Sequence, residues 1–186
     1  MNLADKISAL RIALVPVFVS LLVYSCSTPF LINIAVAVFI LAVLSDFLDG
    51  LVARIRKEKS DIGQIIDPVA DKLFLFASFF SLYLLRDSLP LAYKMPLGIV
   101  LAAAGRDVVV LSGLLTLYIL KKDVNIAPSV WGKLTTFFQM LTVLMLFLNI
   151  SWFIWVCRIA VIFTIISGIG YFIRGVKAGN DHTVSG

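Results

Sequence analysis

The sequence predicts an all-α membrane protein with six transmembrane helices, and three observations support this fold class. Hydrophobic residues make up 61% of the 186 residues, whereas charged residues make up only 15%. A soluble domain cannot bury that much apolar surface. The apolar residues form about six runs of roughly 20 residues, the length that crosses a hydrocarbon core of about 30 Å. We expect one integral-membrane domain over residues 1–186, with a polar tail over 178–186.

Six spans are expected, and the connections between them are short. The first span follows a brief polar lead without a small-residue cleavage site, so we expect it to be retained rather than removed as a signal peptide. A polar, charged segment over residues 55–62 separates the second span from the third. In chain order, the expected spans are residues 8–25, 30–53, 64–86, 95–120, 131–149 and 152–174.

Basic residues near the span ends predict the orientation in the membrane. Only Arg86 and Lys94 clearly fall on one side, while eleven other basic residues near the span ends fall on the opposite side. The positive-inside rule therefore places both termini and the 54–59 loop in the cytoplasm. The net charge of +5 suits anionic lipid headgroups and does not require a nucleic-acid partner. The basic residues assigned to the cytoplasmic side are Lys6, Arg11, Arg54, Arg56, Lys57, Lys59, Lys121, Lys122, Lys133, Arg174 and Lys177.

Four aspartates lie in one strongly apolar stretch, within the pattern D-x2-D-G-x2-A-R-x8-G-x3-D-x3-D. An ionisable residue at membrane depth costs at least a few kcal/mol, so four acids need a compensating cation. Asp46 and Asp49 are three residues apart, and Asp67 and Asp71 are four apart, so each pair shares a helix face. An antiparallel hairpin brings the two pairs to similar depths. Four converging carboxylates suit Mg²⁺ or Mn²⁺.

Small residues beside the aspartates allow two interpretations. Gly50, Ala53 and Gly63 remove side-chain bulk, which would let a phosphate-bearing ligand approach the backbone and the metal. Alternatively, such residues are close-packing positions between membrane helices. The acids themselves could instead form an ion or proton pathway. Because they cluster at one cytoplasmic end, beside an arginine and three small residues, the sequence favours a metal site.

The remaining chemically reactive side chains carry no predicted function. Cys26 and Cys157 lie in or beside expected spans, without the spacing of zinc or redox sites, so we expect apolar packing roles. His182 lies in the polar tail and is expected to be solvated.

The spacing from Asp46 to Asp71 resembles the signature of the CDP-alcohol phosphatidyltransferases at all eight defining positions. The opening segment over residues 2–11 resembles the N-I-P-N-x-L-T-x-x-R of the bacterial phosphatidylglycerophosphate synthases in that family, although Ala4 and Asp5 replace its Pro and second Asn. Residues 60–72 resemble the T-x-x-G-x-x-x-D-P-x-A-D-K segment of the same enzymes. Residues 105–107 and 132–136 resemble the segments on the acceptor side.

The resemblance implies a six-helix membrane enzyme, usually a homodimer, in which an alcohol displaces CMP from CDP-diacylglycerol. It implies that Asp46, Asp49 and Asp67 hold the metal, and that Asp71 joins them and acts as general base. It further implies a CDP site formed by Asp46, Gly50, Ala53, Arg54, Ser60 and Gly63. A bacterial cell-membrane enzyme with a cytoplasmic active site is expected.

Arg106 and Lys133 are the candidate acceptor-binding residues, because cations near the cytoplasmic ends of the fourth and fifth spans can bind an anionic acceptor phosphate. Their alternatives are snorkelling to the interface, or pairing with Asp107. A phosphate-bearing acceptor favours glycerol 3-phosphate. Phosphatidylglycerol, which would make the chain a cardiolipin synthase, and the inositol phosphate of phosphatidylinositol-phosphate synthases remain alternatives. A cation carrier would use the same aspartates but would not release CMP.

Overall fold

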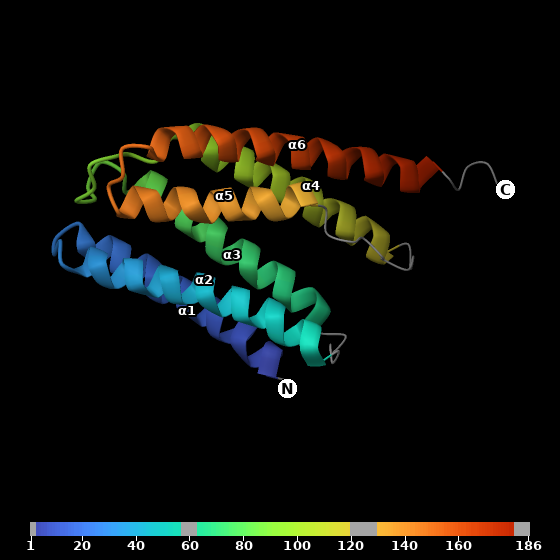
Figure 1. The fold of residues 1–186 in the computed structure, drawn as a ribbon, viewed down its shortest axis with the longest axis horizontal. Helices are drawn as coiled ribbons and strands as arrows, with labels where there is room; N and C mark the ends of the chain where they lie inside the picture. Colours follow the sequence, from blue (N-terminus) through green and yellow to red (C-terminus); the bar gives the residue numbers. More distant parts are fainter. Residues whose placement is uncertain (1–2, 57–62, 120–129, 181–186) are drawn as a thin grey trace. The chain divides into compact units, whose positions relative to one another are not determined.

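The computed structural model describes the backbone over residues 3–56, 63–119 and 130–180, and it describes side chains over 10–45, 72–110, 112, 130–170 and 173. Six helices account for most of this backbone (Figure 1). They are α1 (Leu3–Ser25), α2 (Leu31–Arg56), α3 (Gly63–Leu84), α4 (Leu97–Ile119), α5 (Val130–Phe147) and α6 (Phe153–Asn180).

The predicted helix order is confirmed, and most boundaries fall within three residues of the expected ones. The clearest difference is at the carboxyl end, where α6 continues to Asn180 rather than ending at residue 174. Arg174 ends the expected span and the extension carries Lys177, and straight-chain basic residues are good helix formers that can extend a helix beyond the apolar region. The polar tail is therefore helical at its start.

Two of the helices are individually long and apolar enough to cross a membrane, judged by length and composition over the described residues. These segments are Val130–Phe147 and Phe153–Gly170. Shorter apolar helical segments occur over Leu10–Ser25, Leu31–Ser45 and Lys72–Leu84. The structure thus supports helices that span a membrane, while a full set of six spans stays a prediction.

The chain divides into two compact units that are not contiguous in sequence. The first unit comprises Met1–Pro96 with Val143–Ser151, and the second comprises Leu97–Thr142 with Trp152–Gly186. The end of α5 therefore belongs to the first unit, although the rest of α5 belongs to the second. We describe each unit by itself.

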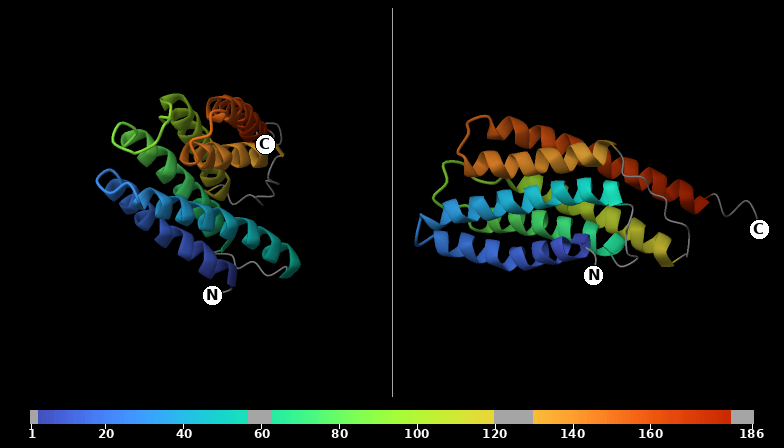
Figure 2. Two further views of the ribbon diagram at one scale, coloured as in Figure 1. Left: turned by 60° about the vertical axis from the view of Figure 1, so that its left-hand side comes forward. Right: turned by 60° about the horizontal axis from the view of Figure 1, so that its bottom comes forward.

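Aromatic side chains form the core of the first unit. In this unit α1 packs against both α2 and α3, and α1 and α2 lie side by side in both views of Figure 2. The ring of Phe18 lies 6.0 Å from that of Phe39, 5.4 Å from that of Phe74 and 6.1 Å from that of Phe147, measured between centroids. Tilted and edge-on aromatic contacts at these distances are favourable. We call these four residues the phenylalanine cluster.

A polar clamp fixes the end of α5 within the first unit. Asn149 has a φ of 52°, a left-handed conformation that asparagine adopts more readily than most residues. The amide of Ile150 donates to the carbonyl of Met145, which completes a helix-terminating turn. Asn149 Oδ1 also accepts a hydrogen bond of 2.7 Å from the amide of Ala92, in the α3–α4 loop. The loop and the end of α5 are thereby joined.

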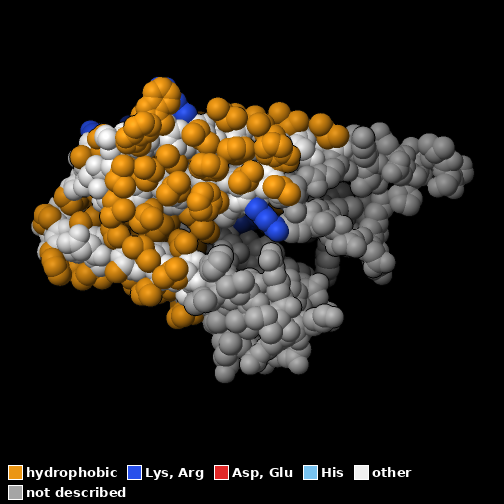
Figure 3. Space-filling view, in the orientation of Figure 1, with side chains coloured by type: hydrophobic (Ala, Val, Ile, Leu, Met, Phe, Trp, Pro, Cys, Tyr) orange, Lys and Arg blue, Asp and Glu red, His pale blue; other side chains and the backbone are white. Residues whose placement is uncertain are grey.

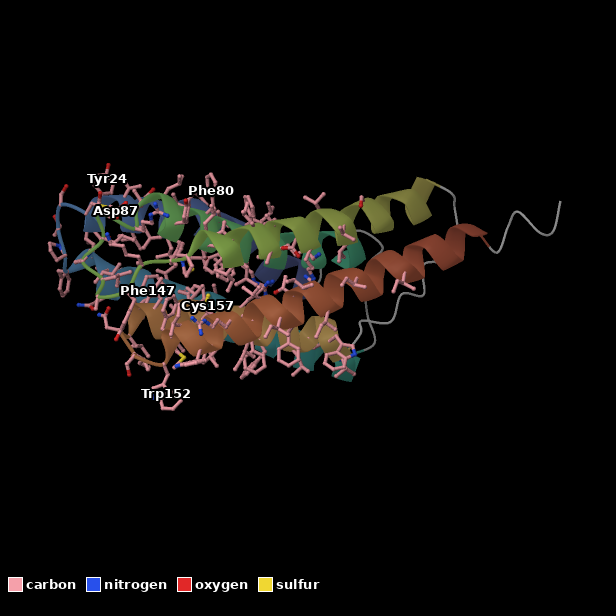
Figure 4. All side chains as sticks on the ribbon, turned by 90° about the horizontal axis from the view of Figure 1, so that it is seen from above. Tyr24, Phe80, Asp87, Phe147, Trp152 and Cys157 are labelled. Atoms are coloured by element: carbon pink, nitrogen blue, oxygen red, sulfur yellow. The ribbon has the colours of Figure 1, made fainter. Side chains whose placement is uncertain are left out.

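The α3–α4 loop carries an exposed ion pair. Lys94 Nζ donates to Asp87 Oδ1 at 2.6 Å, and this hydrogen bond holds the pKa of Asp87 below its ordinary value. Figure 4 shows Asp87 at the same end of the first unit as Tyr24, which lies at the end of α1. The loop follows the carboxyl end of α3, so it lies at the end of that helix opposite Gly63.

Hydrogen bonds between polar side chains link α5 and α6 in the second unit. Thr135 Oγ1 donates to the carbonyl of Phe163 at 2.9 Å, and Gln139 Nε2 donates to Thr164 Oγ1 at 3.1 Å. All three polar side chains are buried. Such bonds hold helices together where lipid removes the hydrophobic drive for association. We call Thr135, Gln139 and Thr164 the polar seam.

Apolar side chains dominate the described surface in the view of Figure 3. On α6 the exposed residues include Ile162, Ile165, Ile166 and Ile169. A contiguous apolar surface of this kind is expected where a helix faces lipid.

Candidate functional site

The backbone places most predicted donor-site residues on two helices of the first unit. Asp46 and Asp49 lie on α2, and Asp67 and Asp71 lie on α3. Gly50, Ala53 and Arg54 also belong to α2, and α3 begins at Gly63. The side chains of these residues lie outside those that the structure describes. Ser60 lies outside the described backbone as well.

The buried face of α2 continues into the aspartate positions. Ala35, Phe39 and Ala42 are buried, and they repeat at spacings of four and three residues. Asp46 and Asp49 follow Ala42 by four and seven residues within the same helix. Residues at these offsets share one helical face. The aspartates of α2 therefore occupy register positions of the face that packs inside the first unit.

The same relation holds on α3. Phe74 and Ser78 are buried and lie four residues apart. Asp71 precedes Phe74 by three residues, and Asp67 precedes it by seven. Two acid pairs, on two helices of one packed unit, thus continue faces that meet at the phenylalanine cluster, since Phe39 and Phe74 are 5.8 Å apart between ring centroids.

The chemistry of this donor set fits a divalent metal ion. Carboxylate oxygens are the ligands that Mg²⁺ and Mn²⁺ prefer, and acids at membrane depth need positive charge nearby. Among the side chains that the structure describes, no group of three or more potential metal ligands occurs. The four aspartates fall outside that set, so the metal site stays a prediction.

Arg106 and Lys133, the predicted acceptor-binding residues, both lie in the second unit but in different surroundings. The side chain of Arg106 is only 9% exposed, and its Nη1 donates to Asp107 Oδ1 at 2.7 Å. A Cβ added at Gly168 of α6 would lie 3.8 Å from the Cβ and Cγ of Arg106, so α6 covers the stem of this arginine. Lys133, in the first turns of α5, is exposed.

The ion pair of Arg106 with Asp107 agrees with the alternative that Arg106 pairs with its neighbour. Binding of the acceptor by Arg106 stays a prediction. The observed pair accounts for how a cation can be buried here.

Arg11 is a buried cation, although its place near a span end predicts an interfacial position. It is 3% exposed and lies on the same face of α1 as the buried Phe18 and Leu22. The spacing of seven residues from Arg11 to Phe18 places both on one helical face, but the sequence does not show that this face is buried.

Comparison with known proteins identifies the family of the chain. The CDP-alcohol phosphatidyltransferase family matches residues 1–166 of the chain. A protein of Aquifex aeolicus, named CDP-diacylglycerol–glycerol-3-phosphate 3-phosphatidyltransferase, is 32% identical over 146 residues, which are 77% of this chain and 74% of that protein. Proteins of the same name from Rickettsia bellii and Bacillus subtilis are 32% and 29% identical, covering 92% and 95% of this chain and 93% and 96% of their own lengths.

The match covers α1 to α5 and the first half of α6, including both acid pairs and the segments around Arg106 and Lys133. The chain therefore belongs to the CDP-alcohol phosphatidyltransferase family and is an enzyme of that class.

Proposed function

We propose that this enzyme transfers a phosphatidyl group from CDP-diacylglycerol to glycerol 3-phosphate, releasing CMP and forming phosphatidylglycerophosphate. The names of the relatives from Aquifex aeolicus, Rickettsia bellii and Bacillus subtilis support this choice of acceptor. The observation that carries the proposal is the continuation of two packed helix faces, on α2 and α3, into four aspartate positions.

The donor side of the reaction is assigned to the first unit. Asp46, Asp49, Asp67 and Asp71 would hold Mg²⁺ or Mn²⁺, which when bound neutralises the pyrophosphate and stabilises the CMP leaving group. Gly50, Ala53 and Gly63 leave room for the CDP moiety beside the backbone. Arg54 and Ser60 complete the proposed CDP site, together with Asp46.

Asp71 is proposed as the general base. The acceptor oxygen forms a bond to the phosphorus of the lipid phosphate, while the bond from that phosphorus to the oxygen of CMP breaks. Asp71 takes the proton of the acceptor hydroxyl as the new bond forms, which is worth about 10² to 10⁴ in rate for a positioned base. No cysteine or histidine nucleophile is required.

Arg106 and Lys133 are proposed to bind the phosphate of the acceptor. A planar guanidinium binds phosphate through two parallel hydrogen bonds, and a lysine adds a flexible point charge. The burial of Arg106 supports a specific role, because snorkelling to the interface would leave this side chain more exposed.

Phosphatidylglycerol is the second candidate acceptor, which would make the product cardiolipin. The Arg106-Asp107 sequence favours it, because this pair is similar to the one in eukaryotic-type cardiolipin synthases. The same cations could then bind a lipid headgroup phosphate. The shared chemistry is a phosphate monoester or diester, and only an assay separates the two.

A cation carrier is less well supported by the packing of the first unit. The buried rings of the phenylalanine cluster lie directly beyond the acid pairs along α2 and α3. An ion path along these faces would meet apolar rings, which cannot replace water around an ion.

The deciding experiment incubates the purified enzyme with CDP-diacylglycerol and each acceptor in turn, and follows CMP release. We expect release with glycerol 3-phosphate in the presence of Mg²⁺ or Mn²⁺, and none after addition of excess EDTA. Release with phosphatidylglycerol alone would establish the cardiolipin alternative. Full release in EDTA would refute the metal site.

We further propose a homodimer in a bacterial cell membrane, with the 54–59 loop in the cytoplasm. The basic-residue asymmetry motivates this orientation. In a Cys26→Ser background, Lys57→Cys should resist an impermeant thiol reagent added to intact cells, whereas Ser88→Cys in the exposed α3–α4 loop should react. The reverse labelling pattern would invert the orientation.

A further inference from the structure

Arg11 is buried where an isolated cation would be costly. Arg11 is 3% exposed. It shares the packed face of α1 with Phe18, Leu22 and Ser25, which are each 0% exposed. Moving an arginine out of water costs several kcal/mol unless an anion compensates its charge. The burial of Arg11 therefore calls for negative charge in the first unit at the same depth.

Helix register identifies the anions. Arg11 precedes Phe18 by seven residues on α1, Asp46 follows Phe39 by seven residues on α2, and Asp67 precedes Phe74 by seven residues on α3. The three phenylalanines are in mutual contact. Because α2 runs antiparallel to both α1 and α3 (Figure 2), each step of seven leads towards the same end of the unit. Each step covers about 10 Å at 1.5 Å per residue.

Arg11 therefore lies level with two of the four aspartates, and Asp71 and Asp49 lie about one turn to either side of that level. The four aspartates lie on α2 and α3, and both of these helices pack against α1. We call this level, defined by Arg11, Asp46 and Asp67, the carboxylate layer.

Arg11 is 3% exposed, so side chains of the protein surround its charge. A role within the protein follows.

We propose that Arg11 is a positioning residue, the permanent counter-cation of the carboxylate layer. It offsets part of the mutual repulsion of the four carboxylates, so that α1, α2 and α3 remain packed when no metal is bound. This rests on the proposed function, since it takes the four aspartates to be the metal ligands. With metal bound, the same charge helps to hold Asp46 and Asp67 in place.

The test measures thermal unfolding of the purified full-length protein in detergent, in excess EDTA and in excess Mg²⁺. Arg11→Met keeps the apolar stem without the charge, and Arg11→Lys keeps the charge. Arg158→Met is the matched control, because Arg158 is exposed and stacks over Trp155 in the second unit, 4.9 Å from its ring centroid.

We expect Arg11→Met to lower the Tm in EDTA by about 10 °C, the scale of a broken buried ion pair in a chain of this length. Mg²⁺ should raise its Tm by more than it raises that of the wild type, because the metal replaces the missing charge. Arg11→Lys should lie between the two proteins, and Arg158→Met should behave as the wild type does. An Arg11→Met protein with wild-type Tm in both conditions would overturn the proposal.

A double variant covers the case in which Arg11→Met does not fold. Adding Asp46→Asn removes one negative charge, so the pair should regain most of the Tm lost in EDTA, a non-additivity expected only of interacting residues. Purely additive effects would overturn the role of Arg11. Failure of the metal proposal has a different signature: the wild type itself would then show no Tm change with Mg²⁺, while the coupling of Arg11 to Asp46 in EDTA would persist.

Discussion

The two units hold their helices together in different ways. The first packs through the rings of the phenylalanine cluster, whereas the second adds the hydrogen bonds of the polar seam to the ring contacts of Trp131 and Phe138 with Phe163. Along the helices of the first unit, the buried Arg11 and, by register, the four aspartates lie towards one end, beyond the phenylalanine cluster. In the second, polar groups are distributed along α5 and α6. Ionised side chains are thus placed where apolar rings separate them from the rest of the core. Neutral polar side chains instead form the hydrogen bonds that hold membrane helices together.

The largest test of this contrast is Asp71→Asn in the first unit. The amide cannot accept the proton of the acceptor hydroxyl, so we expect kcat to fall by about 10² to 10⁴-fold. The KM for CDP-diacylglycerol should change far less. Asp87→Asn serves as the control, because Asp87 lies in the exposed α3–α4 loop and its loss should leave kcat unchanged. Near-native turnover of Asp71→Asn would exclude this residue as the base.

Arg106→Ala tests the second unit. Loss of a charged hydrogen bond to phosphate should raise the KM for glycerol 3-phosphate by about 10 to 100-fold. The KM for CDP-diacylglycerol should stay within a few-fold, because only the acceptor interaction is removed. The variant also leaves Asp107 without its 2.7 Å partner, so the Tm should be recorded in parallel. Equal effects on both substrates would assign Arg106 a structural role.

Gln139→Leu should have a moderate effect confined to stability. It removes the 3.1 Å hydrogen bond to Thr164 in a buried position, and such bonds between membrane helices contribute about 1 kcal/mol. We expect a Tm lower by about 2 to 4 °C, with unchanged KM for both substrates. A cycle with Thr164→Val measures the coupling directly. A Tm at or above that of the wild type would show that the polar seam does not stabilise the unit.

The smallest effect is expected from the exposed pair of Asp87 and Lys94. The pKa of Asp87 is lowered in the folded protein, so the pair stabilises the fold above the unfolded pKa of about 4 and loses this contribution as the pH falls through the folded pKa. The Tm difference between the wild type and Asp87→Asn should therefore be constant near neutral pH and vanish in acid. A difference that grows in acid would contradict this assignment.

The helices were predictable from the sequence because each depends on a long apolar run. Their order and most of their ends agree with the expected spans. The sequence also predicted that the two aspartates of each pair share a helix face. Offsets of three and four residues place side chains on one face of any α-helix, independent of what packs around it. The match of these pairs with the buried faces of α2 and α3 needed the structure.

The division into two units and the burial of Arg11 were not predictable in the same way. Both depend on which rings meet across helices, as Phe18 meets Phe74, and hydropathy does not encode such pairings. Its charge and its place near a span end predict that Arg11 lies at the interface. The structure instead buries it beside an aromatic face.

Asn149 has a consequence for the order of assembly. Its hydrogen bond to Ala92 spans 57 residues of chain, and Phe147 adds the fourth ring to a cluster whose other members lie on the first three helices. A ribosome delivers α4 and most of α5 before either contact can form. The aromatic core of the first unit therefore stays incomplete while helices of the second unit are being synthesised. Its completion is a late step of biogenesis, governed by the emergence of residues 143–151 rather than by its own amino-terminal sequence.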